Sequence, residues 1–261
     1  MKAIKTLLAI LLTFFLFGYQ SDFKKNNDKN AWQSLFNGKD LSHWIVKIKG
    51  YKIGVNAHNT FRVENGLLKV SYANYDSFNN QFGHIFYKKP FKSYILQLEY
   101  RFVGRQVKGG PSWGNRNNGI MIFSQAPESM AINQDYPVSV EFQLLGGLAD
   151  GKTRPTGNVC TPGTNIVMKD SLVTTHCINS SSKTYFGNQW VKAEVEVHSD
   201  SLIIQRINGK EVIRYSKPQI GGRFNTFKNR VGEILKSGYI ALQSESSPTE
   251  FKNIKIKELK K

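Results

Sequence analysis

The clearest structural signal in this chain is the run Val191-Lys192-Ala193-Glu194-Val195-Glu196-Val197-His198, in which apolar and polar residues alternate. The turn pair Ser199-Asp200 connects this run to Leu202 to Ile207, and Asn208-Gly209 connects that segment to Glu211 to Tyr215. A two-residue hydrophobic period is that of a strand with one buried face, and Asn-Gly favours a tight hairpin turn. The region therefore predicts an antiparallel three-stranded meander.

The same period extends over most of the remaining chain. It predicts a hairpin at residues 61–72 with its turn at Asn65-Gly66, a long strand ending at Phe102, and closing strands over 238–244 and 251–259. No segment shows a helical period beyond about one turn. Many strands joined by turns indicate an all-β sandwich or jelly roll of antiparallel sheets. We expect the long irregular segments, residues 104–117, 146–182 and 219–237, to be functional or mobile.

The N-terminus has the pattern of a secretory signal. Lys2 and Lys5 precede an apolar run from Leu7 to Phe17, and small and polar residues follow. A membrane-spanning helix needs roughly 20 apolar residues, so this run is too short to be an anchor. We predict a signal peptide over 1–21, a flexible tether over 22–30 and a single β-sandwich domain over 31–261. The protein is then exported, to the periplasm or beyond.

The two cysteines, Cys160 and Cys177, lie 17 positions apart. In an exported chain this pair favours a disulfide, and closing a loop of that length contributes about 3 kcal/mol in the loop-entropy model. Two buried thiols are the alternative.

The formal net charge is +17, and +15 after loss of Lys2 and Lys5. The basic residues are spread along the chain, and no nucleic-acid-binding motif accompanies them. We therefore expect no nucleic-acid partner and no stable membrane insertion after signal removal. The excess positive charge is interpreted as solvated surface that attracts acidic polysaccharide or lipid head groups.

The segment Val138 to Leu144 is the most informative for function. Its apolar residues belong to one face, which leaves Ser139, Glu141 and Gln143 on the other, roughly 7 Å apart. A carboxyl and an amide in line can bind sugar hydroxyls, and Glu141 can act as an acid or a base. A solvent-facing polar stripe is the alternative interpretation.

Four further residues are candidates for a site. Asn118 begins an apolar strand, and Trp113 lies in the preceding Gly-rich loop, where it can stack on a sugar ring or cap the core. His176 neighbours Cys177 and suits a general base or a hydroxyl ligand, although a loop histidine is often merely exposed. His84 is a weaker candidate of the same kind.

Metal and phosphate motifs are absent from the sequence. We therefore predict no cofactor and no metal ligands; a structural Ca²⁺ held by loop carbonyls would leave no sequence signature. The expected ligand is a small saccharide or an oligosaccharide, and the sequence specifies no oligomeric state.

Several phrases, in order and over nearly the whole chain from Ala31, resemble the 3-keto-disaccharide hydrolase family of exported bacterial proteins. They are Leu35 to Trp44, Phe61 to Leu68, Phe91 to Arg101, Asn117 to Ile120, Val140 to Leu144, Pro155 to Gly157, Trp190-Val191, Asn208-Gly209, Gly238 to Gln243 and Phe251 to Ile254.

This resemblance implies a concanavalin-like jelly roll and the cleavage of 3-keto glycosides. A carbonyl at sugar C3 acidifies the C2 proton, so a base can remove it while the anomeric substituent leaves, and water can then add. By position Glu141 would be the base or a principal sugar ligand. Gln143, Asn118 and His176 would be donors that stabilise the enolate oxygen.

Two functions are compatible with these residues. One is an enzyme that cleaves glycosidic bonds, and the other is a non-catalytic, lectin-like binding module on the same fold. Replacement of Glu141 by its amide separates them, because only the enzyme needs a base.

Overall fold

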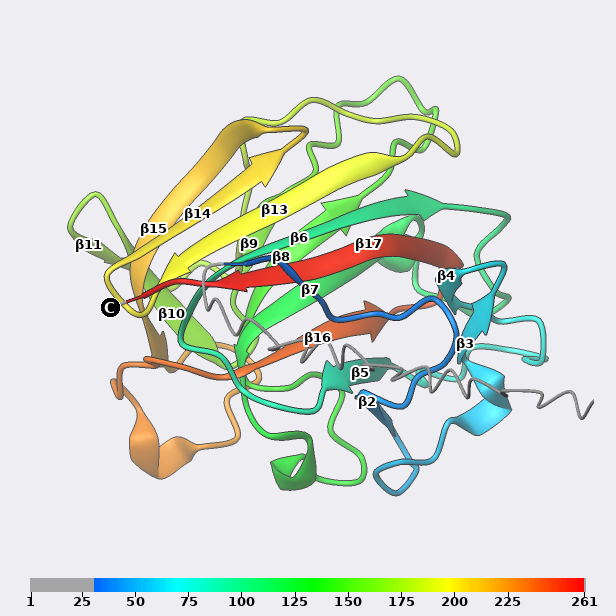
Figure 1. The fold of residues 1–261 in the computed structure, drawn as a ribbon, viewed down its shortest axis with the longest axis horizontal. Coiled ribbons are helices and arrows are strands. Elements are labelled where there is room, and N and C mark those ends of the chain that lie inside the picture. The colour runs from blue at the N-terminus through cyan, green and yellow to red at the C-terminus, as the bar shows by residue number, and fades with distance from the viewer. Residues whose placement is uncertain (1–30, 261) are drawn as a thin grey trace, which may run out of the picture.

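A computed structural model describes residues 31–260 as two antiparallel β-sheets that pack face to face (Figure 1). The predicted all-β jelly-roll sandwich is thereby confirmed. In spatial order the first sheet contains β11 (Ser171–Val173), β10 (Thr164–Met168), β15 (Lys210–Ile220), β14 (Leu202–Ile207), β13 (Val191–His198), β6 (Ser93–Phe102), β17 (Thr249–Glu258), β4 (Leu67–Val70) and β3 (Phe61–Glu64), and β1 (Gln33–Ser34) also pairs with β17.

The second sheet has seven strands. In spatial order they are β12 (Cys177–Ile178), β9 (Asn158–Cys160), β8 (Val140–Leu145), β7 (Asn117–Ser124), β16 (Tyr239–Ser244), β5 (Gly83–Tyr87) and β2 (Trp44–Ile48). The only helices among residues 31–260 are four single 3₁₀ turns, at η1 (Ala57–Asn59), η2 (Ser112–Gly114), η3 (Pro127–Ser129) and η4 (Lys228–Arg230).

The predicted meander is confirmed with its turns. β13 pairs with β14 from Ala193 opposite Ile207 to His198 opposite Leu202, and β14 pairs with β15. In Figure 1 the long strands β13, β6 and β17 run side by side across the molecule. Asn208 and Gly209 both have positive φ, 48° and 81°, as a type I′ turn requires.

One apolar core fills the space between the sheets. The alternating residues of β6, such as Leu96 and Leu98, belong to the same buried cluster as Ile120 of β7 and Val140 and Phe142 of β8. Because strand side chains alternate between faces, the residues between these in β7 and β8 point away from the first sheet. They build the outer face of the second sheet.

The segment 146–182 differs from its sequence interpretation. It contains four short strands, β9 to β12, of two to five residues each. Strands this short carry too few alternating positions to produce a visible period. Their strand conformation depends instead on the neighbouring strands with which they pair.

The predicted signal peptide and tether lie outside the described residues. Within the described part of the chain, no helix is both long and apolar enough to span a membrane.

Candidate functional site

Strand β8 provides the floor of a cavity of about 590 Å³ on the outer face of the second sheet. Val140 and Phe142 are fully buried in the core, while Glu141 and Gln143 line the cavity, as strand alternation predicts. Glu141 is nevertheless only 7% exposed, because loops surround it. The predicted polar stripe is therefore enclosed and does not face open solvent.

Gly119 makes room for the carboxyl of Glu141. This glycine lies on β7, paired with Gln143. A Cβ atom built on it would lie 2.5 Å from Glu141 Oε1 and 2.7 Å from its Cγ, which is closer than real contacts allow. The Glu141 side chain therefore lies across the bare backbone of β7, and any larger residue there would displace it.

A second carboxyl, that of Glu245, lines the same cavity. Glu245 follows the last residue of β16, and its carboxyl Oε1 accepts a hydrogen bond of 3.3 Å from Gln243 Nε2. The residue is 3% exposed, and its other oxygen, Oε2, is buried without a partner among the described residues.

Burial governs the acidity of both carboxyls. It raises the pKa of Glu141 from 4.5 to about 8. Burial also raises the pKa of Glu245 well above its ordinary value, and the charge of Glu141 adds to this, whereas Tyr136 and Arg154 act in the opposite direction. Desolvation and a neighbouring like charge are the established causes of such shifts, which are typical of acid–base sites.

Aromatic rings form a continuous arc beside these carboxyls. Trp113 stacks on Phe82 with ring centroids 5.9 Å apart and planes 8° from parallel. Phe82 contacts Tyr136 at 5.1 Å, Tyr136 contacts Phe224 at 5.2 Å, and Phe224 contacts His176 at 5.4 Å. Trp113, Tyr136, Phe224 and His176 line the cavity. Faces of this kind pack against the apolar side of sugar rings.

The Cys160–Cys177 disulfide is present and forms part of the cavity wall. It joins β9 to β12, and Cys160 pairs with Glu141 across β8 and β9. His176 therefore lies beside the carboxyl floor, and its Nδ1 is buried without a partner in the described chain. Burial and the charge of Arg223 lower the pKa of His176, which favours the neutral imidazole.

The placement predicted for Asn118 is wrong. Asn118 pairs with Leu144 and points into the core, fully buried. There its Nδ2 donates to Gln243 O at 2.8 Å and to Thr249 Oγ1 at 3.3 Å, so it braces the interior. Asn117 lines the cavity instead, and its Oδ1 is buried without a partner among residues 31–260. Counting back in twos from the core residue Ile120 would have assigned the two asparagines correctly.

His84 also lies away from the cavity. It occupies the outer face of the same sheet, but the residue is 1% exposed, and its ring lies 6.3 Å from the ring of Tyr136. The loop after η3 covers this region, since Lys47 Nζ donates to Ile132 O at 3.0 Å. Burial and the nearby Lys47 lower the pKa of His84 to about 3, so it is neutral. The local sequence around His84 does not reveal that a loop distant in sequence covers it.

Sequence reasoning missed Glu245, Tyr136 and Arg154. Arg154 Nη1 donates to Gly146 O at 2.7 Å and to Asn115 O at 2.7 Å, and this fixes the loop that carries Trp113. Glu245 had a usable signal, because it follows Gln243 by two positions and so continues one face of β16. Tyr136 and Arg154 lie in loops, which have no hydrophobic periodicity from which the direction of a side chain could be predicted.

In the part of the chain that the structure describes, no three or more His, Cys, Asp or Glu side chains are grouped as a metal site would need. What the cavity offers is two buried carboxyls, amide and imidazole acceptors without a partner among residues 31–260, and aromatic faces. This donor set suits a polyhydroxylated ligand and proton transfer on it.

Solved structures with the same fold include two proteins from Parabacteroides distasonis ATCC 8503 described as candidate glycosyl hydrolases. The first is 18% identical, with a TM-score of 0.53, and the match covers 88% of this chain and 100% of that one. The second is 20% identical, with a TM-score of 0.50, covering 88% and 94%. The exoplasmic/lumenal domain of VIP36 bound to Ca²⁺ and Man3GlcNAc is 10% identical, with a TM-score of 0.50, covering 90% of each chain.

No curated protein matches the chain in sequence. Residues 31–257 match a family described as the 3-keto-alpha-glucoside-1,2-lyase-like domain. The match spans both sheets and every cavity residue named above. The resemblance detected in the sequence is thereby confirmed, and the chain belongs to the 3-keto-alpha-glucoside-1,2-lyase-like family of carbohydrate-active proteins.

Proposed function

We propose that this protein cleaves the glycosidic bond of 3-keto glycosides, with Glu141 as the base that removes the C2 proton. The observation that supports this most is the Glu141 carboxyl, which is enclosed on the floor of a cavity of sugar-binding character. A raised pKa makes a carboxylate a stronger base than one in water. Family membership supports the substrate class.

The proposed reaction has two stages. In the first, Glu141 takes the C2 proton, which the C3 carbonyl makes acidic, and the C2–H electron pair passes into the enolate. The enolate then collapses to form the C1–C2 double bond as the C1–O bond breaks. In the second, water adds across that double bond. The net change is hydrolysis, and no oxidant or reductant is consumed.

The remaining cavity residues have supporting roles in this proposal. The amide of Gln143 and the ring of His176 contact the sugar hydroxyls and the enolate oxygen. Asn117 replaces Asn118 in this set because it is the asparagine that lines the cavity. Trp113 and Phe224 pack against the faces of the sugar and its substituent.

The disulfide supports export as the setting for this activity. Disulfides persist in oxidising compartments, and this one adjoins the site itself. We therefore propose that the protein acts in the periplasm or outside the cell on saccharides of small size.

The test compares an ordinary glucoside with its 3-keto form, using the wild type and Glu141→Gln. The wild type should cleave only the 3-keto form, because the C2 proton of the ordinary glucoside is not acidic enough. Glu141→Gln preserves size but cannot accept a proton, so activity should fall on the order of 100-fold or more. Circular dichroism and thermal unfolding check that the variant is folded.

A binding module predicts a different pattern. Inertness toward both glucosides, together with sugar binding measured by calorimetry that survives Glu141→Gln, would overturn the enzymatic proposal. The aromatic arc and the amide oxygen of Asn117, which has no partner in the described part of the chain, would then belong to a lectin-like site.

A further inference from the structure

Glu245 reaches the cavity from the opposite side of β7 to Glu141. In the second sheet β7 lies between β8, which carries Glu141, and β16, which ends just before Glu245. Gly119 of β7 has no side chain, so the Glu141 carboxyl lies over the backbone of that strand, and its charge acts on Glu245. Both glutamates therefore border one space, and a sugar bound there has a carboxyl toward each side.

The surroundings of Glu245 leave one oxygen free for a ligand. Gln243 Nε2 donates to Oε1, whereas Oε2 has no partner in the described chain although the residue is 97% buried. The ionisable groups that act on it are Glu141, Tyr136 and Arg154. Arg154 donates its own hydrogens to backbone carbonyls of the Trp113 loop and to Gly146 O. No ion pair among residues 31–260 includes Glu245. Tyr136 and the charge of Arg154 favour its charged form, but burial and the charge of Glu141 outweigh them, so the pKa of Glu245 is raised.

From this arrangement we propose that Glu245 is the general acid that protonates the departing glycosidic oxygen, as the partner of Glu141. The proposal rests on the proposed function and names the second catalytic group of that same site. In the active form Glu141 is ionised and Glu245 carries the proton. Burial raises the pKa of both carboxyls, and the charge of Glu141 favours the neutral form of Glu245, which agrees with this division.

The protons balance through the full cycle. As the C1–O bond breaks, the leaving oxygen takes the proton of Glu245, while Glu141 already holds the proton from C2. The pair has exchanged roles. When water adds, Glu245 as carboxylate removes a proton from the water that attacks C1, and Glu141 returns its proton to C2. Both groups end in their starting states, and the site is ready for another substrate.

The experiment uses two 3-keto glucosides that differ only in the leaving group. A nitrophenyl glycoside leaves as a stable anion and needs no acid, whereas a methyl glycoside must be protonated as it leaves. Release of the leaving group in the first turnover is measured, because the later addition of water is common to both substrates. In that turnover Glu245→Gln should slow release of methanol on the order of 100-fold or more and release of nitrophenolate less than about 10-fold. Glu141→Gln should lose activity on both, because both need the base. Glu211→Gln is the matched control, because the Glu211 carboxyl pairs with Arg214 on β15 of the first sheet and does not line the cavity, and it should retain the wild-type rates.

The ratio of the two rates within one variant does not depend on how much of the sample is folded. Glu245→Asp keeps an acid on a shorter arm and should restore part of the methyl glycoside rate. Equal losses on both substrates in Glu245→Gln, with wild-type activity present, would overturn the acid role while leaving the base role of Glu141 standing. A wild type inert to both 3-keto substrates would overturn the proposed function and the role of Glu245 together.

Discussion

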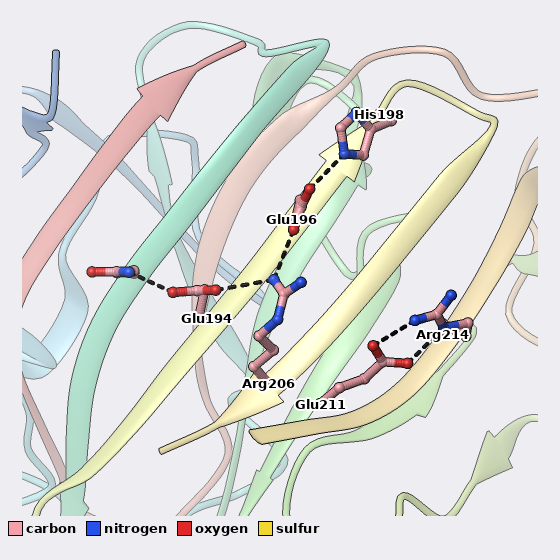
Figure 2. Close-up of polar contacts among 7 residues, drawn as sticks. Glu194, Glu196, His198, Arg206, Glu211 and Arg214 are labelled. Carbon is pink, nitrogen blue, oxygen red and sulfur yellow. Dashed lines mark hydrogen bonds and ion pairs between the residues drawn. The ribbon is translucent and has the colours of Figure 1, made fainter. Parts of the chain in front are cut away.

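Two glutamates with almost the same local sequence have opposite environments in this molecule. Val195-Glu196-Val197 lies on β13 and Val140-Glu141-Phe142 on β8, and in each case the apolar neighbours are fully buried. Glu196 belongs to the charged ladder on the outer face of the first sheet, in which Arg206 Nη1 contacts Glu194 at 3.0 Å and Glu196 at 2.8 Å (Figure 2). Glu141 has no cation partner in any described ion pair, and loops enclose it.

The acidities follow from this difference. Burial alone would raise the pKa of Glu196, but hydrogen bonds from His198 and Arg206 and the charge of Arg206 outweigh it, so the pKa is lowered. At Glu141 burial acts unopposed and the pKa rises to about 8. The alternating pattern thus decides which face a glutamate occupies. What covers that face decides whether the residue is a structural anion or a group that can move protons.

The largest effect should come from filling the space next to Glu141. Gly119→Ala places a methyl group where the carboxyl lies. A misplacement of about 1 Å can cost on the order of 100-fold in rate, so activity toward 3-keto glucosides should fall by about that factor while the fold persists. Ile120→Val is the matched control on the core face of the same strand, and it should lower stability by about 1 kcal/mol and spare activity. A fully active Gly119→Ala would contradict the placement of the carboxyl.

The pH dependence of stability should separate the two glutamates. The folded state binds the Glu141 proton more tightly than the unfolded chain does. The contribution of protonated Glu141 to the free energy of unfolding is therefore complete below the ordinary pKa of 4.5 and is lost as pH rises through about 8. For Glu196 the contribution is present above its ordinary pKa and is lost as pH falls through the lowered folded value.

Urea unfolding across the pH range measures both slopes. Glu141→Gln should flatten the decline in the free energy of unfolding as pH rises from about 4.5 to about 8, and Glu196→Gln the decline as pH falls below about 4.5. An unchanged slope between about pH 4.5 and 8 in Glu141→Gln would mean that the Glu141 carboxyl is hydrated in the folded protein. In the same pH series, catalytic efficiency should rise as Glu141 ionises near pH 8.

The smallest effect should come from the charged ladder. Arg206→Gln removes the contacts to Glu194 and Glu196, and partly exposed ion pairs of this kind contribute about 1 kcal/mol or less. The free energy of unfolding should fall by that amount at low salt and by less at high salt, with activity unchanged. Arg214→Gln, which breaks the exposed pair with Glu211, should have a smaller effect still. A large loss of activity in Arg206→Gln would show that the outer face of the first sheet is coupled to the cavity on the second sheet.

Most of the fold could be predicted from the sequence because its strands are long enough to show their period. Ser93–Phe102 and Val191–His198 alternate over eight or more residues. Asn65-Gly66 and Asn208-Gly209 mark two hairpin turns elsewhere in the same sheet. The short strands β9 to β12 could not be predicted, since two to five residues carry no readable period.

The candidate site was predictable only where it lies on a strand. Alternation places Glu141 and Gln143 on one face, and it also separates Asn117 from Asn118, although the wrong asparagine was chosen. His84 satisfies the same local rule, but a loop covers it. Tyr136 comes from a segment whose approach to the cavity depends on contacts across long sequence distances.

By itself the sequence determined the sandwich, the faces of its long strands, the cysteine pair and the family, because these depend on local periodicity, turn chemistry and residue order. Only the tertiary structure decided which polar face became a cavity, and that Glu245 shares it with Glu141. The physical reason is that a glutamate's proton affinity depends on the water and charges around it. Loops distant in sequence supply the cover that removes that water.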